Sequence, residues 1–141
     1  MSTTPAPTVM VERAIRAPIE DVFAAMTTPE LMARWLSPTG HAEVDADVRV
    51  GGRLRVVMLG EGVRIEHTGE YLTVAPPSLL AFTWISAYTG DEPSVVTITL
   101  ESRSAETWLR LQHERLPLSA GESHRGGWHS IIERLAHLVE A

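Results

Sequence analysis

The sequence predicts an α+β fold, in which a curved antiparallel sheet of about six or seven strands wraps around a long C-terminal helix. One strand-like segment and two short helical segments precede a series of strand-like segments separated by turn residues. Residues 63–74 alternate polar and apolar side chains with a period of two, which indicates a sheet covered on one face only. Apolar residues then recur at steps of three and four over 128–139, as on one face of a helix.

The N-terminal part of the chain contains the first strand and the two short helices. Residues 9–16 are apolar and β-branched enough to form a strand. Residues 19–26 form the first predicted helix, with acidic residues in the first turn, where the helix dipole favours anions. Thr28 is the expected N-cap of the second helix, and Pro29 is its first residue.

Six further strands and the long helix make up the rest of the chain. The strands are expected at residues 41–45, 53–59, 63–74, 79–87, 93–101 and 106–113. The helix is expected at 122–140, but a glycine inside a helix costs about 1 kcal/mol relative to alanine. Because Gly126 and Gly127 are adjacent, the regular helix is expected to begin only near Trp128.

Length and composition limit the function classes. The 141 residues suit one domain, expected at residues 9–141 after a disordered tail at 1–8. All 12 basic residues are Arg and there is no Cys, which excludes Schiff-base lysines, thiolate nucleophiles and Cys-ligated zinc. A net charge of −6 argues against a nucleic-acid partner. No membrane span, secretion signal, metal-ligand spacing or phosphate loop is apparent, so we expect a cytoplasmic protein without cofactor or metal.

Six stretches together resemble one known superfamily. They are RAIRAPIEDVFAAMTTPELMARWL (13–36), DADVRVGGRLRVVM (45–58), GEYLTVAPPSLLAFTW (69–84), SVVTITL (94–100), TWLRLQHERL (107–116) and GGWHSIIERLAHLV (126–139). In order and spacing they resemble the SRPBCC (START-like, helix-grip) superfamily, and within it the group related to the C-terminal domain of the activator of Hsp90 ATPase. The resemblance implies the helix-grip fold, with a cavity between the C-terminal helix and the concave sheet face. It does not choose among the superfamily's hydrophobic-ligand binders, cyclases and co-chaperone domains.

The predicted inward positions define the expected ligand pocket. The candidates are Trp35, Met58, His67, Tyr71, Phe82, Trp84, His113, Trp128, Ile131, Ile132 and Leu135. An aliphatic residue of this set more often belongs to the ordinary core. A large aromatic residue is about as often part of a pocket wall as part of the core. His67 and His113 are the main polar candidates, because both fall on the inward parity of their strands. With Tyr71 they are also the catalytic candidates, although each histidine could instead bind a ligand or be a satisfied core residue.

The residues on the outward face of the last predicted strand form a candidate interface. Trp108 and Arg110 fall on its polar side, and aromatic residues with Arg are enriched at protein interfaces. We therefore expect a homodimer contact through this face. The alternative is that neighbouring Arg stems or the N-terminal tail cover Trp108.

Three functions follow, in order of preference. The first is binding of a small hydrophobic molecule in the cavity, with no chemistry assigned, because this needs only a concave apolar face and one or two inward polar groups. The first alternative is a cyclase- or hydrolase-like enzyme that uses His67 or His113 as acid or base. The second alternative is an Hsp90-type co-chaperone domain, as the resemblance suggests.

Overall fold

The computed structural model describes residues 8–37 and 39–140. Residues 1–7 of the expected tail therefore lie outside the described residues, as do Pro38 and Ala141. The elements are β1 (Val9–Ile15), α1 (Ile19–Thr27), α2 (Pro29–Trp35), β2 (Ala42–Ala46), β3 (Arg53–Gly60), β4 (Val63–Ala75), β5 (Leu79–Trp84), β6 (Ser94–Arg103), β7 (Glu106–Glu114) and α3 (Gly121–Val139), with 3₁₀ turns η1 (Ala87–Thr89) and η2 (Leu118–Ala120).

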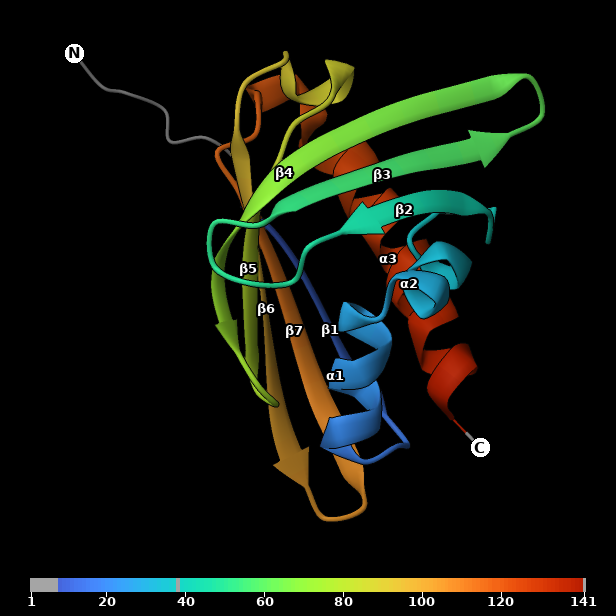
Figure 1. Cartoon of the computed structure of the whole chain (residues 1–141), viewed down its shortest axis with the longest axis vertical. Coiled ribbons are helices and arrows are strands. Elements are labelled where there is room, and N and C mark those ends of the chain that lie inside the picture. The colour runs from blue at the N-terminus through green and yellow to red at the C-terminus, as the bar shows by residue number, and fades with distance from the viewer. Residues whose placement is uncertain (1–7, 38, 141) are drawn as a thin grey trace.

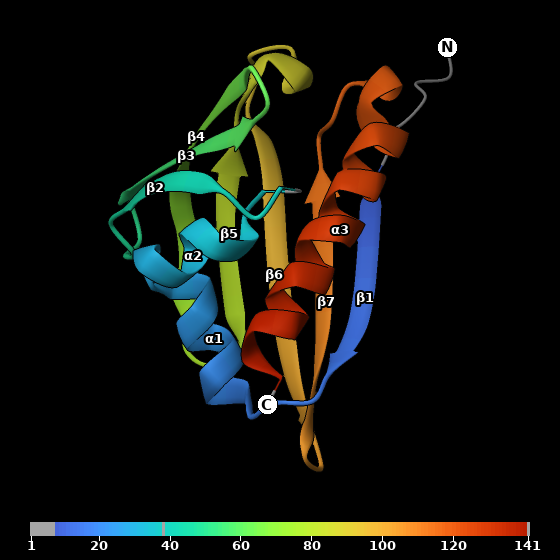
Figure 2. The ribbon, with the colours of Figure 1, turned by 90° about the vertical axis from the view of Figure 1, so that its right-hand side faces the viewer.

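The seven strands form one antiparallel sheet in the order β1-β7-β6-β5-β4-β3-β2. In Figure 1, β5, β6, β7 and β1 run alongside one another, whereas β2, β3 and the first half of β4 cross that direction. Figure 2 shows α3 lying over β6, β7 and β1, with α1 and α2 beside it on the same side of the sheet. This arrangement confirms the predicted α+β helix-grip fold.

The change of direction occurs within β4. Its first part pairs with β3 as far as Glu70, and its last part pairs with β5 from Tyr71 onward. At Gly69 the strand passes so close to β5 that an added Cβ would lie 1.9 Å from the Thr83 carbonyl oxygen. Only glycine permits this approach without moving a strand, so Gly69 allows the sheet to curl around α3.

The concave face carries the core, as strand parity predicted. Leu54, Val56, Leu80, Ile98 and Leu111 are each at most 2% exposed. From α3, the side chains at the predicted steps of three and four are buried against them: Trp128, Ile131, Ile132 and Leu135. Buried and more exposed residues alternate along β7 and along β6 as far as Leu100, so the less buried side chains lie on the convex face.

Three local predictions were inexact. β5 ends at Trp84 rather than at residue 87, because the Ser86 side chain accepts a hydrogen bond from the Tyr88 amide and starts η1. α3 begins at Gly121 rather than near Trp128. The helix continues through Gly126 and Gly127 because the packing of the following apolar residues outweighs the cost of the two glycines. Thr28 occupies the N-cap position of α2 as predicted, but its side chain makes no capping hydrogen bond.

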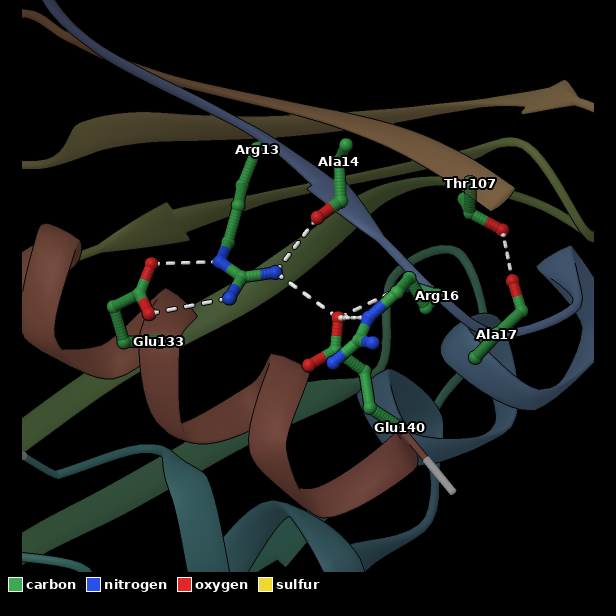
Figure 3. Close-up of polar contacts among 7 residues, drawn as sticks. All are labelled: Arg13, Ala14, Arg16, Ala17, Thr107, Glu133 and Glu140. Carbon is green, nitrogen blue, oxygen red and sulfur yellow. Dashed lines mark hydrogen bonds and ion pairs between the residues drawn. The ribbon is translucent and has the colours of Figure 1, made fainter. Parts of the chain in front are cut away.

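An ion-pair cluster holds the C-terminal half of α3 on β1 (Figure 3). The Arg13 guanidinium donates from Nε and Nη2 to the two carboxylate oxygens of Glu133, at 2.6 and 3.3 Å. Its Nη1 donates to Glu140 at 3.2 Å, and Glu140 also accepts from the Arg16 amide at 3.0 Å. Arg13 lowers the pKa of Glu133, and the Arg16 amide is the main cause of the lowered pKa of Glu140. The forked geometry makes Arg13 the centre of the cluster.

Replacing Arg13 should therefore weaken the fold more than replacing its neighbour. We expect Arg13→Met to lower the free energy of unfolding by about 1–2 kcal/mol, since its hydrogen bonds to charged groups are lost. Arg16→Met is the matched control: its side chain is 76% exposed and the backbone bond to Glu140 remains. We expect it to cost less than about 0.5 kcal/mol. Equal losses in urea denaturation at pH 7 would contradict the role given to Arg13.

Gly69→Ala should destabilise the protein by about 2–3 kcal/mol, because the new methyl group overlaps the Thr83 carbonyl and must displace β5. The control is Gly126→Ala, since a Cβ at Gly126 meets nothing within 4 Å. That variant should be unchanged or more stable by up to about 1 kcal/mol. Thermal unfolding of both variants gives the comparison, and a fully stable Gly69→Ala protein would refute the steric argument.

Candidate functional site

A pocket of about 170 Å³ lies between the N-terminal half of α3, the paired strands β3 and β4, and η1. This is the end of α3 that Figure 2 shows uppermost, away from α1 and α2. The lining residues are Met58, Ile65, His67, Trp84, Tyr88, Ser123, His124, Gly127, Trp128 and Ile131. Tyr88 is 56% exposed, so the pocket reaches solvent beside its ring.

Two indoles and one imidazole form adjoining walls of the pocket. The ring centroids of Trp84 and Trp128 are 5.6 Å apart, at an interplanar angle of 47°. The His67 ring stacks on Trp84 with a centroid distance of 4.5 Å and an angle of 27°. The aliphatic side chains of Met58 and Ile131 complete an apolar surface around these rings.

A buried hydrogen-bond chain links the Trp128 indole to the backbone of Trp84. Trp128 Nε1 donates to His113 Nδ1 at 2.9 Å, and His113 Nε2 lies 2.7 Å from Ser94 Oγ. Because an indole N–H can only donate, Nδ1 of His113 is the acceptor and its proton resides on Nε2. Nε2 therefore donates to Ser94 Oγ, which in turn donates to the Trp84 carbonyl. The chain joins α3 to β7, β6 and β5, and it uses both nitrogens of His113.

His113 is consequently a neutral core histidine. It is completely buried, and burial is the main reason that its pKa is lowered to about 3. The nearby His124 and His67 rings lower the pKa further. His113 does not line the pocket. Its partners are Trp128 and Ser94, which corresponds to the alternative of a satisfied core residue.

His67 differs, because one of its two ring nitrogens is buried without a hydrogen-bond partner. The residue is 5% exposed and lines the pocket, and within residues 8–37 and 39–140 its Nδ1 has no hydrogen-bond partner. Burial lowers its pKa to about 4, a change that outweighs the opposing effect of the Ile65 and Val56 carbonyls. At neutral pH it therefore holds one N–H and one lone pair in an apolar environment. Leaving such a group unpaired costs about 1–3 kcal/mol, so a ligand or water partner is expected.

Local hydrogen bonds position the remaining polar lining. His124 Nδ1 donates to the Ala120 carbonyl at 2.8 Å, and Ser123 Oγ donates to the same oxygen at 3.1 Å. Both bonds hold the first turn of α3 in place. Ser86 positions Tyr88, since it accepts from the Tyr88 amide at 3.1 Å.

The structure brings together five of the sequence candidates: Met58, His67, Trp84, Trp128 and Ile131. The candidates Trp35, Tyr71, Phe82, His113, Ile132 and Leu135 are buried but lie outside the pocket lining. Trp35 donates to the Ala25 carbonyl at 2.9 Å. The Tyr71 hydroxyl is buried without a partner among the described residues, and burial raises its pKa.

Sequence reasoning missed half of the lining: Ile65, Tyr88, Ser123, His124 and Gly127. Positions 124, 127, 128 and 131 share one face of a helix, but that signal is visible only if the helix begins before Trp128. Tyr88 lies in a connection that was assigned to no element. Ile65 lies two residues before His67 and so shares its face of β4, but it was not among the pocket candidates.

The proposed interface residues contact their own neighbours. Trp108 Nε1 donates to Glu12 at 3.0 Å, and Arg110 lies 3.5 Å from the same carboxylate. The Arg103 guanidinium covers the Trp108 ring at 4.7 Å. These contacts correspond to the alternative in which Arg side chains cover the indole. A homodimer contact through this face remains a prediction.

Two searches of the described residues were negative. No group of three or more His, Cys, Asp or Glu side chains among them could hold a metal ion. None of the described helices is long and apolar enough to cross a membrane.

Comparison with known proteins identifies relatives of the fold. Protein CV1439 from Chromobacterium violaceum is 29% identical, with a TM-score of 0.86 over 96% of this chain and 99% of that one. Protein MLL2253 from Mesorhizobium loti is 30% identical, with a TM-score of 0.78 over 94% and 96%. PFC0360w, an Hsp90 activator from Plasmodium falciparum, is 20% identical, with a TM-score of 0.76 over 93% and 94%, a likeness that shows the fold alone.

No curated protein sequence matches the chain. The family model for activator of Hsp90 ATPase homolog 1-like protein matches residues 16–140, which is most of the chain. The helix-grip architecture and the solved relatives agree with that match. The chain therefore belongs to the activator of Hsp90 ATPase homolog 1-like family, within the SRPBCC group that its sequence resembles.

Proposed function

We propose that this protein binds a small, mostly apolar molecule in the pocket between α3 and the strands β3 and β4. The observation that carries this proposal is His67, whose Nδ1 is buried without a hydrogen-bond partner among the described residues, in the lining of a pocket with mostly apolar walls. Binding sites of this kind combine apolar surface with a few polar groups that orient the ligand. Family membership and the helix-grip fold support the same assignment.

An acid–base enzyme is less well supported. A general base needs a free lone pair and a pKa near the working pH, whereas His113 has both nitrogens bonded and a pKa of about 3. His67 has a free nitrogen, but no Asp or Glu is among the described residues of the lining to orient it. The pocket therefore suits binding better than proton transfer.

The four tryptophans provide an internal test of ligand binding. We expect a library of small apolar compounds to shift the indole ¹H–¹⁵N signals of Trp84 and Trp128, which line the pocket. The signals of Trp35, buried elsewhere, and Trp108, on the outer face, serve as controls within the same molecule. A library that moves none of the signals, or all four equally, would count against the proposal. Native mass spectrometry of the purified protein can then identify any natural ligand retained.

Burial of two neutral histidines also predicts loss of stability in acid. The unfolded chain binds protons at histidine near pH 6.5, whereas folded His67 and His113 do so only near 4 and 3. Their contribution to stability is therefore fully present above pH 6.5 and is lost as the pH falls towards 4. Two extra protons on the unfolded chain give a slope of up to about 2.7 kcal/mol per pH unit.

Urea denaturation between pH 4.5 and 6 measures this slope. Glu133 and Glu140, whose pKa values are lowered in the folded protein, add to the slope at the acid end, and this addition cancels when two variants are compared. The variant His67→Phe should reduce the slope by about 1.4 kcal/mol per pH unit, because its unfolded chain binds one proton fewer. It keeps a ring for stacking on Trp84 and removes the unpaired nitrogens. A stability that does not change between pH 4.5 and 6 would show that neither histidine is buried in the neutral form.

A further inference from the structure

We propose that the pocket selects an uncharged ligand whose buried part is a single aromatic ring with a hydroxyl group, bound to the His67 imidazole and accommodated by Gly127. The inference rests on the proposed function and names the ligand class for the same site. It follows from the size, charge and hydrogen-bonding capacity of the pocket, and from a glycine that the rest of the protein does not require.

Size limits the buried part of the ligand to about one ring. An apolar cavity of about 150 Å³ in a protein core accommodates benzene. The pocket of about 170 Å³ is only slightly larger, and Trp84 and Trp128 contribute apolar atoms to its lining. A fused pair of rings or a long acyl chain could not be enclosed. Substituents can leave beside Tyr88 and Ser123, the exposed residues of the described lining.

Charge excludes ionised ligands. The described lining contains no Arg, Asp or Glu, and the chain has no Lys. His67 is neutral at pH 7 because burial holds its pKa near 4. A carboxylate or ammonium group would lose its hydration without gaining an ion-pair partner, at a cost of several kcal/mol.

The polar group of the ligand is a hydroxyl because it suits either tautomer of His67. A neutral imidazole offers one donor and one acceptor, and a hydroxyl can both donate and accept. A ketone or ether can only accept, so it would pair with only one orientation of the ring. Among the described lining residues, His67 is the buried polar one, and its Nδ1 has no hydrogen-bond partner.

Gly127 is the residue that leaves room for the ring. A Cβ added there meets no atom within 4 Å, so neighbouring protein atoms do not require a glycine. Glycine at this position nevertheless costs the helix about 1 kcal/mol relative to alanine. Gly127 lines the pocket, whereas Gly126 lies in an outer groove between α3 and β1. A methyl group at 127 would occupy space that the ligand needs; nothing in the structure explains the glycine at 126.

Titration of the Trp84 and Trp128 indole signals with phenol, benzene, benzoate and 1-naphthol tests the proposal. In the wild-type protein we expect phenol to bind about tenfold more tightly than benzene, the gain from one hydrogen bond to a buried group. Benzoate and 1-naphthol should bind at least tenfold more weakly than phenol. His67→Phe should bind phenol and benzene equally, because the walls remain and the hydrogen bond is gone.

The two glycines form a matched pair of variants. Both Gly126→Ala and Gly127→Ala should unfold at the same or a higher temperature than the wild type, since both favour the helix. Only Gly127→Ala should weaken phenol binding, by about tenfold or more, because its methyl group reduces the pocket. Measuring both properties separates a loss of binding from a loss of folding.

Each contrary result overturns a distinct part of the inference. Equal binding of phenol and benzene by the wild type would refute the hydroxyl, and tight binding of 1-naphthol would refute the one-ring limit. Unchanged phenol affinity in Gly127→Ala would refute the role of Gly127. If library compounds shift the two indole signals but phenol does not, the ligand class is wrong and the proposed function stands. If no compound shifts them, the proposed function itself fails.

Discussion

The hydrogen-bond chain from Trp128 through His113 and Ser94 to the Trp84 carbonyl is the interaction on which the pocket depends. Its direction is determined by the indole N–H at one end, which leaves a single tautomer of His113 that satisfies both neighbours. Each end belongs to a residue that lines the pocket. Because every member is buried, removing one would leave another unpaired. The chain therefore holds the N-terminal half of α3 at a defined distance from β5.

A second, charged contact holds the other end of the same helix. Arg13 joins β1 to Glu133 and Glu140, so α3 is attached to the sheet at two separated places. Near its C-terminal half, α1 and α2 fill the concave face, as Figure 2 shows. Beyond them, the curl of the sheet at Gly69 and the missing side chain at Gly127 leave space between α3, β3 and β4. This explains why the pocket occupies one end of the concave face.

Periodicity was sufficient to predict the fold and part of the site. The alternation in β4 placed His67 on the covered face, and the spacing in α3 identified Trp128 and Ile131 as inward residues. The hydrogen-bond partners of the pocket residues could not be predicted from the sequence. The register that brings Ser94 close to His113 exists only once the strands are paired. The early start of α3 was also missed, because helix propensity counts the cost of Gly126 and Gly127 but not the tertiary contacts that offset it. Because the helix was expected to begin only near Trp128, His124 and Gly127 were not included in the predicted site.

A crystal structure determined after soaking the protein in phenol would test the account most directly. The account predicts one phenol ring between Trp84, Trp128 and Gly127, with its oxygen within hydrogen-bonding distance of the His67 imidazole. The His113 chain should be unchanged, since the pocket exists before the ligand binds. An empty pocket at a saturating phenol concentration, or a pocket closed by movement of α3, would contradict the claim that this site binds a small aromatic molecule.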